Sequence, residues 1–153
     1  MQQAPTDQTA APVREIMSTD IATTNPNRPV LDFARELLAR GLSGMPVVDT
    51  DGALVGMASE YDVISKRGDT VGEIMSRGVI SVPDDAGSDQ VAGLMGLHGI
   101  RRLPVVRDGR LVGIVSRTDL LRLFVARAET DRRTDGQTDR KESAVISRQS
   151  PGR

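Results

Sequence analysis

Hydrophobic residues fall into short groups that alternate between helical and strand spacing along the chain. From Val30 to Arg40, apolar side chains recur at intervals of three and four, which predicts an amphipathic helix that ends at Gly41. Two apolar, β-rich runs follow at 45–48 and 54–58, and the Asp-Gly turn signal between them predicts a β-hairpin. Ser59 then marks the start of a second helix. The predicted order is helix, hairpin, helix, with a short segment and a strand before it.

The same order occurs a second time, 58 residues further along the chain. Val13–Ser18 (VREIMS) matches Val71–Ser76 (VGEIMS) at this offset. After the hairpin turn the offset falls to 57, where Ser59–Asp62 matches Ser116–Asp119. A length change inside a turn is well tolerated. Since a unit of about 50 residues is small for an independent core, the two copies are expected to pack together as one pseudo-symmetric fold.

This repetition divides the chain into four regions. The two repeats are predicted at 13–68 and 69–127. Residues 1–12 and 128–153 are rich in polar residues and poor in apolar ones, which is typical of disordered tails.

Composition and charge exclude several functions. The 153 residues contain no cysteine and a single histidine, His98, so thiol chemistry, cysteine-based zinc sites and multi-histidine metal sites are excluded. A formal net charge of −1 makes nucleic-acid binding unfavourable. No apolar run is long enough to span a membrane, and the N-terminus lacks the apolar stretch of a signal peptide. We therefore expect a cytoplasmic protein without catalytic activity or a metal.

The duplicated motifs resemble those of a tandem CBS-domain pair, also called a Bateman module. Each repeat has a Glu-Ile-Met-Ser segment, a Pro-Val-Val strand (46–48 and 104–106) and a Gly-hydrophobic-x-Ser-x-x-Asp segment (56–62 and 113–119). The resemblance covers about 13–124. It implies an α+β fold built from α/β-type repeats, each a small sheet with two packed helices.

The resemblance also implies adenosine-containing ligands in clefts between the repeats. By this resemblance, the aspartates of the Ser-x-x-Asp motifs bind the ribose hydroxyls. The serines of the same motifs contact ribose or phosphate. Residues before the first strand border the adenine. The predicted ligand-binding residues of these three kinds are Asp62 and Asp119, Ser59 and Ser116, and Thr23, Thr24, Ile80 and Ser81. A carboxylate suits the role because it accepts hydrogen bonds from two vicinal hydroxyls.

A second interpretation of Ser-x-x-Asp needs no ligand. The motif also matches a capping box, in which the serine and the acid stabilise the start of a helix. The two roles are compatible. Tyr61 lies within the first copy, and the sequence leaves open whether it stacks on a base, blocks a cleft or faces solvent.

Before their Pro-Val-Val strands the repeats differ in charge. The second repeat has Arg101 and Arg102, where the first has Ser43 and Gly44. Related adenylate-binding proteins often carry His or Arg here, and the planar guanidinium donates two parallel bonds to a phosphate. The resemblance therefore implies one phosphate-competent cleft. Because 18 of the 20 basic residues are arginine, an adjacent pair also arises readily from composition.

These observations predict a non-catalytic regulatory module that binds AMP, ADP, ATP, S-adenosylmethionine or NAD and signals to an unidentified protein partner. No covalent cofactor is expected. The resemblance further implies a homodimer, with helix faces around 33–38 and 93–97 as candidate interfaces. The alternative is a purely structural dimerisation or interaction module that binds no nucleotide.

Overall fold

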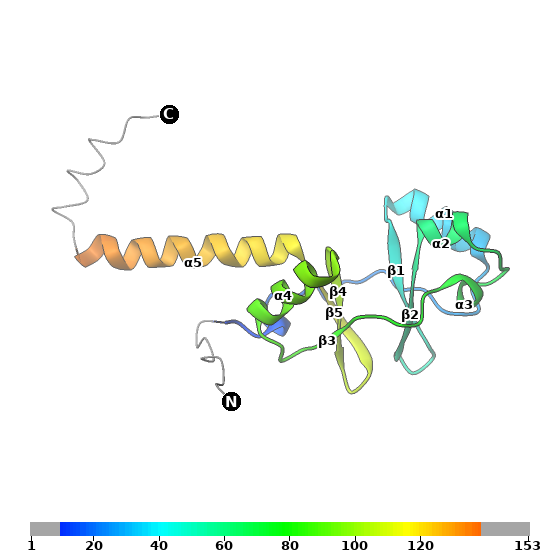
Figure 1. Ribbon diagram of the computed structural model, residues 1–153, viewed down its shortest axis with the longest axis horizontal. Coiled ribbons are helices and arrows are strands. Elements are labelled where there is room, and N and C mark those ends of the chain that lie inside the picture. The colour runs from blue at the N-terminus through cyan, green and yellow to red at the C-terminus, as the bar shows by residue number, and fades with distance from the viewer. Residues whose placement is uncertain (1–9, 139–153) are drawn as a thin grey trace. The chain divides into compact units, whose positions relative to one another are not determined.

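The computed structural model describes residues 10–138, which form two compact units (Figure 1). The first unit ends at Arg117 and the second begins at Thr118. The first unit contains a 3-10 turn, η1 (Val13–Glu15), four helices and five strands. The helices are α1 (Val30–Arg40), α2 (Glu60–Ser65), α3 (Val71–Ile74) and α4 (Ser88–His98), and the strands are β1 (Gly44–Val48), β2 (Leu54–Ser59), β3 (Val82–Pro83), β4 (Arg102–Arg107) and β5 (Arg110–Ser116).

The first predicted helix is confirmed at both ends as α1. Its first backbone N–H, on Val30, donates to the carbonyl of Asp69 at 2.9 Å, so no side-chain cap is needed. At the other end Gly41 has a φ of 63°, the left-handed conformation that glycine adopts without steric cost. Helix α4 of the second repeat ends in the same way at Gly99, directly after His98.

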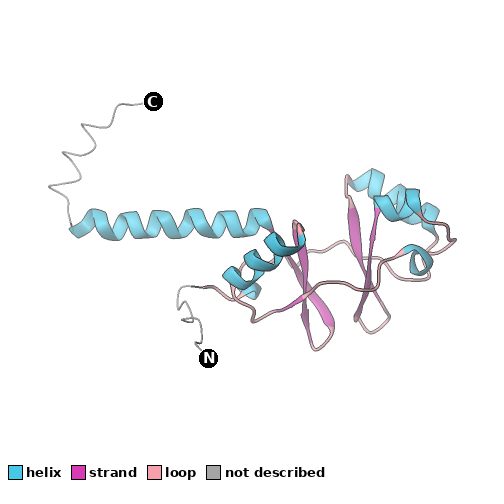
Figure 2. Cartoon of the chain, viewed as in Figure 1, coloured by secondary structure: helices cyan, strands magenta, loops and turns pink. Residues whose placement is uncertain are grey.

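Both predicted hairpins are confirmed, and each belongs to its own small sheet (Figure 2). Strands β1 and β2 form an antiparallel pair, and β4 and β5 form another, to which β3 adds in parallel. The first repeat reduces the strand equivalent to β3 to one bridge, Thr24 with Val47. Both hairpins have a register shift at the same place, at Val47/Val48 and Val105/Val106. The duplicated sequence thus produces a duplicated backbone, including its irregularities.

Each repeat begins with a short opening segment, residues 13–18 in the first repeat and 71–76 in the second. The Met-Ser end of each opening segment pairs with the hairpin of the other repeat. Ser18 of the first repeat and Ile114 of β5 exchange two backbone hydrogen bonds, of 2.8 and 2.9 Å. The equivalent residues Ser76 and Met57 do the same, at 2.8 and 2.9 Å. Each repeat therefore completes the hairpin of the other.

The first residues of the opening segments are exchanged as well. Val13 donates its backbone N–H to the carbonyl of Ala86, and Val71 donates to the carbonyl of Arg28. These pairs also occupy equivalent positions, so the exchange is symmetric along the whole opening segment.

This exchange explains the hydrophobic core around α1. Phe33 and Leu37 of α1 pack with β1 and β2 residues and with Val71 and Met75, which belong to the opening segment of the second repeat. The proposed boundary between residues 68 and 69 divides the sequence repeats, but it does not divide this core. The buried cluster consists of Phe33, Leu37, Met45, Val47, Ala58, Val71 and Met75.

The second unit contains helix α5 (Arg117–Thr138), whose first residue closes the first unit. The sequence placed the start of a disordered tail at residue 128, but the helix continues to Thr138. Composition misled the prediction because a polar, solvent-exposed helix has few apolar residues too. The hydroxyl of Thr130 donates to the carbonyl of Ala126 at 2.9 Å, as it does within a regular helix turn.

The rest of the predicted tails, 1–9 and 139–153, lies outside the described residues. Among the helices of residues 10–138, none combines the length and the apolar character that crossing a membrane requires.

Candidate ligand-binding site

The Ser-x-x-Asp motif of the first repeat forms a capping box at the start of α2. The side chain of Ser59 accepts a hydrogen bond from the backbone N–H of Asp62 at 3.2 Å. In return, Oδ2 of Asp62 accepts from the backbone N–H of Ser59 at 2.8 Å and from its hydroxyl at 3.0 Å. The helix-capping interpretation is therefore confirmed for this copy, and Asp62 is only 6% exposed.

Lys66 is a further residue of this cluster, which the sequence analysis did not identify. Its Nζ atom lies 2.8 Å from Oδ1 of Asp62 and donates to the carbonyl of Ile74 at 3.1 Å. The signal was present in the sequence, because a lysine four residues after an acid lies on the same helix face. Lys66 thus links the capping box of α2 to the last residue of α3.

The strand register brings together two of the predicted residues of the second repeat. Arg102 at the start of β4 is directly opposite Ser116 at the end of β5. Directly opposed side chains of an antiparallel pair lie about 4.5–5.5 Å apart at Cβ. Arg102 and the preceding Arg101 are both exposed. An arginine and a serine are thus neighbours on one face at one end of this hairpin.

The first repeat has no room for an arginine at the equivalent position. Gly44 is directly opposite Ser59, and a Cβ atom on Gly44 would lie 2.7 Å from the carbonyl oxygen of Ala58. That distance is too short for real contacts, so a side chain at residue 44 would force the strands to shift. At residue 44, the charge difference between the repeats therefore has a steric basis.

The second arginine on β4, Arg107, has a structural role. Nε of Arg107 donates to a carboxylate oxygen of Asp84 at 2.8 Å. The hydrogen bonds to this carboxylate raise the pKa of Arg107. Arg107 therefore ties the end of β4 to the segment after β3.

The residues predicted to border the adenine lie before the first strand of each repeat. Thr23 and Thr24 line a surface cavity of about 810 Å³, together with residues 25–29 and 48–50. Thr24 is 4% exposed, and its Oγ1 atom has no hydrogen-bond partner among the described residues. This cavity is not lined by Ser59 or Asp62. Ile80 and Ser81 are partly buried and lead directly into β3.

Asp119, the second predicted ribose-binding residue, lies in the first turn of α5, within the second unit. Its Oδ1 atom is 4.0 Å from Nη1 of Arg122, one helical turn further on.

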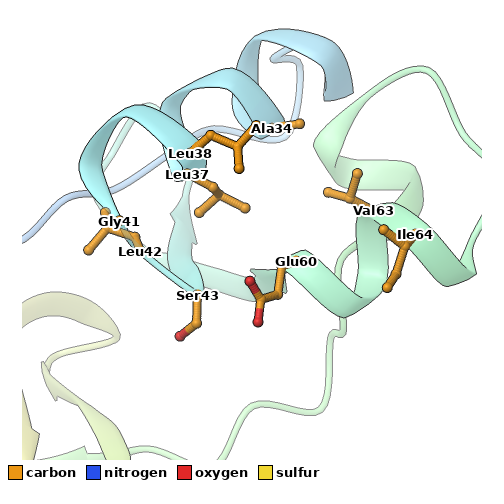
Figure 3. A pocket seen from close by; sticks show the side chains of 9 residues that line it. All are labelled: Ala34, Leu37, Leu38, Gly41, Leu42, Ser43, Glu60, Val63 and Ile64. Carbon is orange, nitrogen blue, oxygen red and sulfur yellow. The ribbon is translucent and has the colours of Figure 1, made fainter.

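A separate apolar cavity of about 470 Å³ lies between α1 and α2 (Figure 3). Figure 3 shows Leu37 and Leu38 of α1 and Val63 of α2 around the gap, with the carboxylate of Glu60 at one side. Leu38 is 85% exposed. Tyr61, whose role the sequence left open, is 70% exposed and is not among the lining residues.

Two copies of one helix–hairpin unit, each with Ser-x-x-Asp after its hairpin, define a tandem-repeat module with hydrogen-bonding groups suited to hydroxyl and phosphate ligands. The chain belongs to the CBS-domain family. The family model "CBS domain" matches residues 13–69 and 71–126.

Similar proteins include both enzymes and isolated pairs of CBS domains. The L-aspartate semialdehyde sulfurtransferase of Methanocaldococcus jannaschii is 35% identical over 116 residues, which cover 73% of this chain but 23% of the relative. The chain thus spans about a quarter of that enzyme's length.

Two solved structures are covered almost completely. The CBS domain pair of protein MJ0100, in complex with 5′-methylthioadenosine and S-adenosylmethionine, has a TM-score of 0.66 and 34% identity, covering 77% of this chain and 98% of that one. CBSX2 from Arabidopsis thaliana in complex with AMP has a TM-score of 0.69 and 29% identity, covering 74% and 96%.

Proposed function

We propose that this chain is a regulatory, non-catalytic module that binds an adenosine-containing ligand and signals the bound state to a protein partner. The observation that carries the proposal is the duplicated Ser-x-x-Asp motif, together with the guanidinium of Arg102 opposite Ser116. The adenosyl ligands of the two similar structures support the ligand class. Ligand binding changes the balance between conformations only by its differential affinity for them.

Each part of the ligand has a candidate partner in the chain. We assign the ribose hydroxyls to the carboxylates of Asp62 and Asp119, and the phosphate to Arg101 and Arg102. The adenine is assigned to the segments at 23–24 and 80–81. The surface cavity of about 810 Å³ that Thr23 and Thr24 line supports this last assignment for the first segment.

We also propose that the module forms a homodimer in the cytoplasm. The apolar cavity between α1 and α2 supports this, because Leu38 and Ile64 at its edge are 85% and 81% exposed. The interface prediction around 33–38 needs one adjustment, since Phe33 is fully buried and belongs to the core. A module that only dimerises, without a nucleotide, is the alternative that the ligand test addresses.

Thermal unfolding of the full chain with AMP, ADP, ATP, S-adenosylmethionine and NAD tests the function. A ligand at 100 times its dissociation constant adds about 2.7 kcal/mol to the free energy of unfolding, which raises the midpoint by several degrees. If none of these compounds moves the midpoint, the adenosyl-binding function is wrong and the dimerisation alternative stands.

Two variants test the assignments within the site. Asp119→Ala is expected to remove most of the ligand-induced shift, whereas Asp85→Ala, which changes an exposed aspartate, is expected to leave it intact. Arg101→Ala is expected to weaken the binding of AMP and to leave the binding of adenosine unchanged. Arg110→Ala is the charge-matched control. Equal binding of AMP and adenosine by the parent protein would remove the phosphate role from the arginines. Intact binding by Asp119→Ala would move the ribose assignment to Asp62.

A further inference from the structure

The apolar cavity between α1 and α2 has a single charge in its lining. Of its nine lining residues, all of them described, only Glu60 is charged. Glu60 is exposed, and Figure 3 shows its carboxylate at one side of the gap. Leu38 and Ile64 line the same cavity and are 85% and 81% exposed. Leu38, Glu60 and Ile64 therefore form an apolar surface with one negative charge, the α1–α2 patch.

The equivalent place in the second repeat carries the opposite charge. The offset of 57 matches Glu60 with Arg117, which is also exposed. The backbone N–H of Glu60 donates to the carbonyl of Ser43 at 2.9 Å, and the N–H of Arg117 donates in the same way to Arg101 at 3.0 Å. Nε of Arg117 donates to the carbonyl of Ile100 at 3.2 Å. A guanidinium has five N–H donors, so the two Nη atoms of Arg117 can still donate to a carboxylate.

The repeats also differ in shape at this place. Leu38 in α1 corresponds to Gly96 in α4 at the offset of 58. Glycine weakens a helix interior relative to alanine. A Cβ atom on Gly96 would meet nothing within 4 Å among the described residues beyond the backbone of its own helix, so no contact there requires glycine. An exposed leucine in the first repeat thus corresponds to a position without a side chain in the second.

Both differences favour contact between unlike repeats of two copies. In a symmetric dimer, a contact between two different residues occurs twice, once in each direction. If like repeats faced each other, Glu60 would meet a second Glu60 and Arg117 a second Arg117, and like charges across an interface are unfavourable. If unlike repeats face each other, both contacts pair a carboxylate with a guanidinium. Leu38 then meets Gly96 instead of a second Leu38.

We propose that two copies of this chain associate in an antiparallel arrangement, with the α1–α2 patch of one copy against Gly96 and Arg117 of the other. This inference rests on the proposed homodimer and specifies the orientation of its two chains. Glu60 and Arg117 select this orientation, because the parallel arrangement brings like charges together.

Charge reversal, followed by sedimentation velocity over a range of protein concentrations, tests the proposal. We expect Glu60→Arg and Arg117→Glu each to raise the dissociation constant of the dimer about tenfold or more, because each variant brings like charges together twice. The variant with both changes restores opposite charges and should return to within about threefold of the parent. Asp85→Arg and Arg110→Glu, at exposed residues elsewhere, are the charge-matched controls. Cooperative thermal unfolding establishes that each variant is folded.

Cross-linking reports the orientation directly, because the parent contains no cysteine. Glu60→Cys and Arg117→Cys copies are mixed and treated with a short bismaleimide. We expect cross-linked dimers that contain one copy of each variant, which mass spectrometry distinguishes by mass from dimers of a single variant. Glu60→Cys alone and Arg117→Cys alone are expected to remain without cross-links.

Different results overturn different conclusions. Unchanged dissociation constants in both single charge variants would overturn the antiparallel arrangement and leave the proposed homodimer intact. Cross-links within Glu60→Cys alone would do the same. A parent that is monomeric at every concentration would overturn the homodimer itself. None of these results changes the adenosyl-binding function, which thermal unfolding with the ligands measures separately.

Discussion

Helix α1 of the first repeat and helix α4 of the second both span eleven residues and both end at a glycine with a φ of 63°. Their hairpins share the same register shift, and their opening segments are exchanged through equivalent hydrogen bonds. On this common backbone the side chains differ. Phe33 corresponds to Val91, and Glu36 to Leu94. The backbone is set by turns and strand register, so the side chains between them are free to diverge in packing and charge.

The largest expected difference between the repeats is in their cores. Phe33 and Val91 occupy equivalent positions, and both are fully buried. Phe33→Ala should lower the free energy of unfolding by about 3–5 kcal/mol because it leaves a large cavity. Val91→Ala removes less apolar volume and should cost about 2 kcal/mol. Urea denaturation measures both values. An equal loss of free energy of unfolding in the two variants would contradict the expected difference between the two cores.

The exchange of opening segments can be tested at Gly113. A Cβ atom on this residue would collide with the side chain of Met17, which belongs to the other repeat, and would lie 3.1 Å from the carbonyl oxygen of Ser18. Gly113→Ala should therefore cost about 1–3 kcal/mol through overpacking. Met17→Ala opens space at this point, so the double variant should lose less stability than the two single variants together.

The three variants Gly113→Ala, Met17→Ala and their combination form a double-mutant cycle. Its matched control uses Met75, the equivalent of Met17. Met75 lies against Gly56, where a Cβ atom would be 2.6 Å from its sulfur. The coupling energy of Gly113→Ala with Met17→Ala is expected at about 0.5–3 kcal/mol, within the usual range for neighbouring residues. Stronger coupling of Gly113→Ala to Met75→Ala would contradict the exchange.

Variants of the capping box in the first repeat should lose less free energy of unfolding than the core variants or Gly113→Ala. Ser59→Ala removes the acceptor for the N–H of Asp62 and is expected to cost about 1 kcal/mol. Ser59→Gly should cost only a few tenths of a kcal/mol relative to the parent, as is usual at this helix position. Chemical denaturation of the three proteins provides the comparison. No loss in Ser59→Ala would show that the hydroxyl of Ser59 does not stabilise the start of α2.

Local patterns predicted the backbone well. The apolar spacing and Gly41 located α1 correctly, and the Asp-Gly turns located both hairpins. At the second turn, Asp108 and Gly109 have φ values of 52° and 77°, as a two-residue hairpin turn requires. These features depend on neighbours in sequence, so a single sequence contains them.

Contacts between distant residues were not predictable in the same way. A repeat offset shows which segments are equivalent, but it does not show which hairpin each segment pairs with. The exchange that places Val71 and Met75 in the core around α1 was therefore missed. At the site, the pairing within Ser59–Asp62 was predictable as a local cap. The contact of Lys66 with Ile74 depends on the exchanged segment and was not.

The smallest expected difference concerns surface charge on α1. Glu36 is paired with Arg28 and, at 3.0 Å, with Arg40, whereas the second repeat has Leu94 at this position. Hydrogen bonds from Arg28 and then Arg40 lower the pKa of Glu36 below its usual value of 4.5. A lowered carboxylate pKa in the folded state stabilises the protein above the unfolded pKa, and that contribution is lost as pH falls through the folded pKa.

Glu36→Gln isolates this pH dependence. Because the ion pairs are partly exposed, the variant should be less stable than the parent by about 0.2–1 kcal/mol at pH 7. The difference should shrink as pH falls below about 4.5, where Glu36 of the unfolded parent begins to protonate, and should disappear as pH falls through the lower pKa of the folded state. Arg28→Ala removes the principal donor and should reduce the same pH dependence. Urea denaturation between pH 7 and pH 3 measures it, and a difference that stays constant over this range would contradict the role of the arginines.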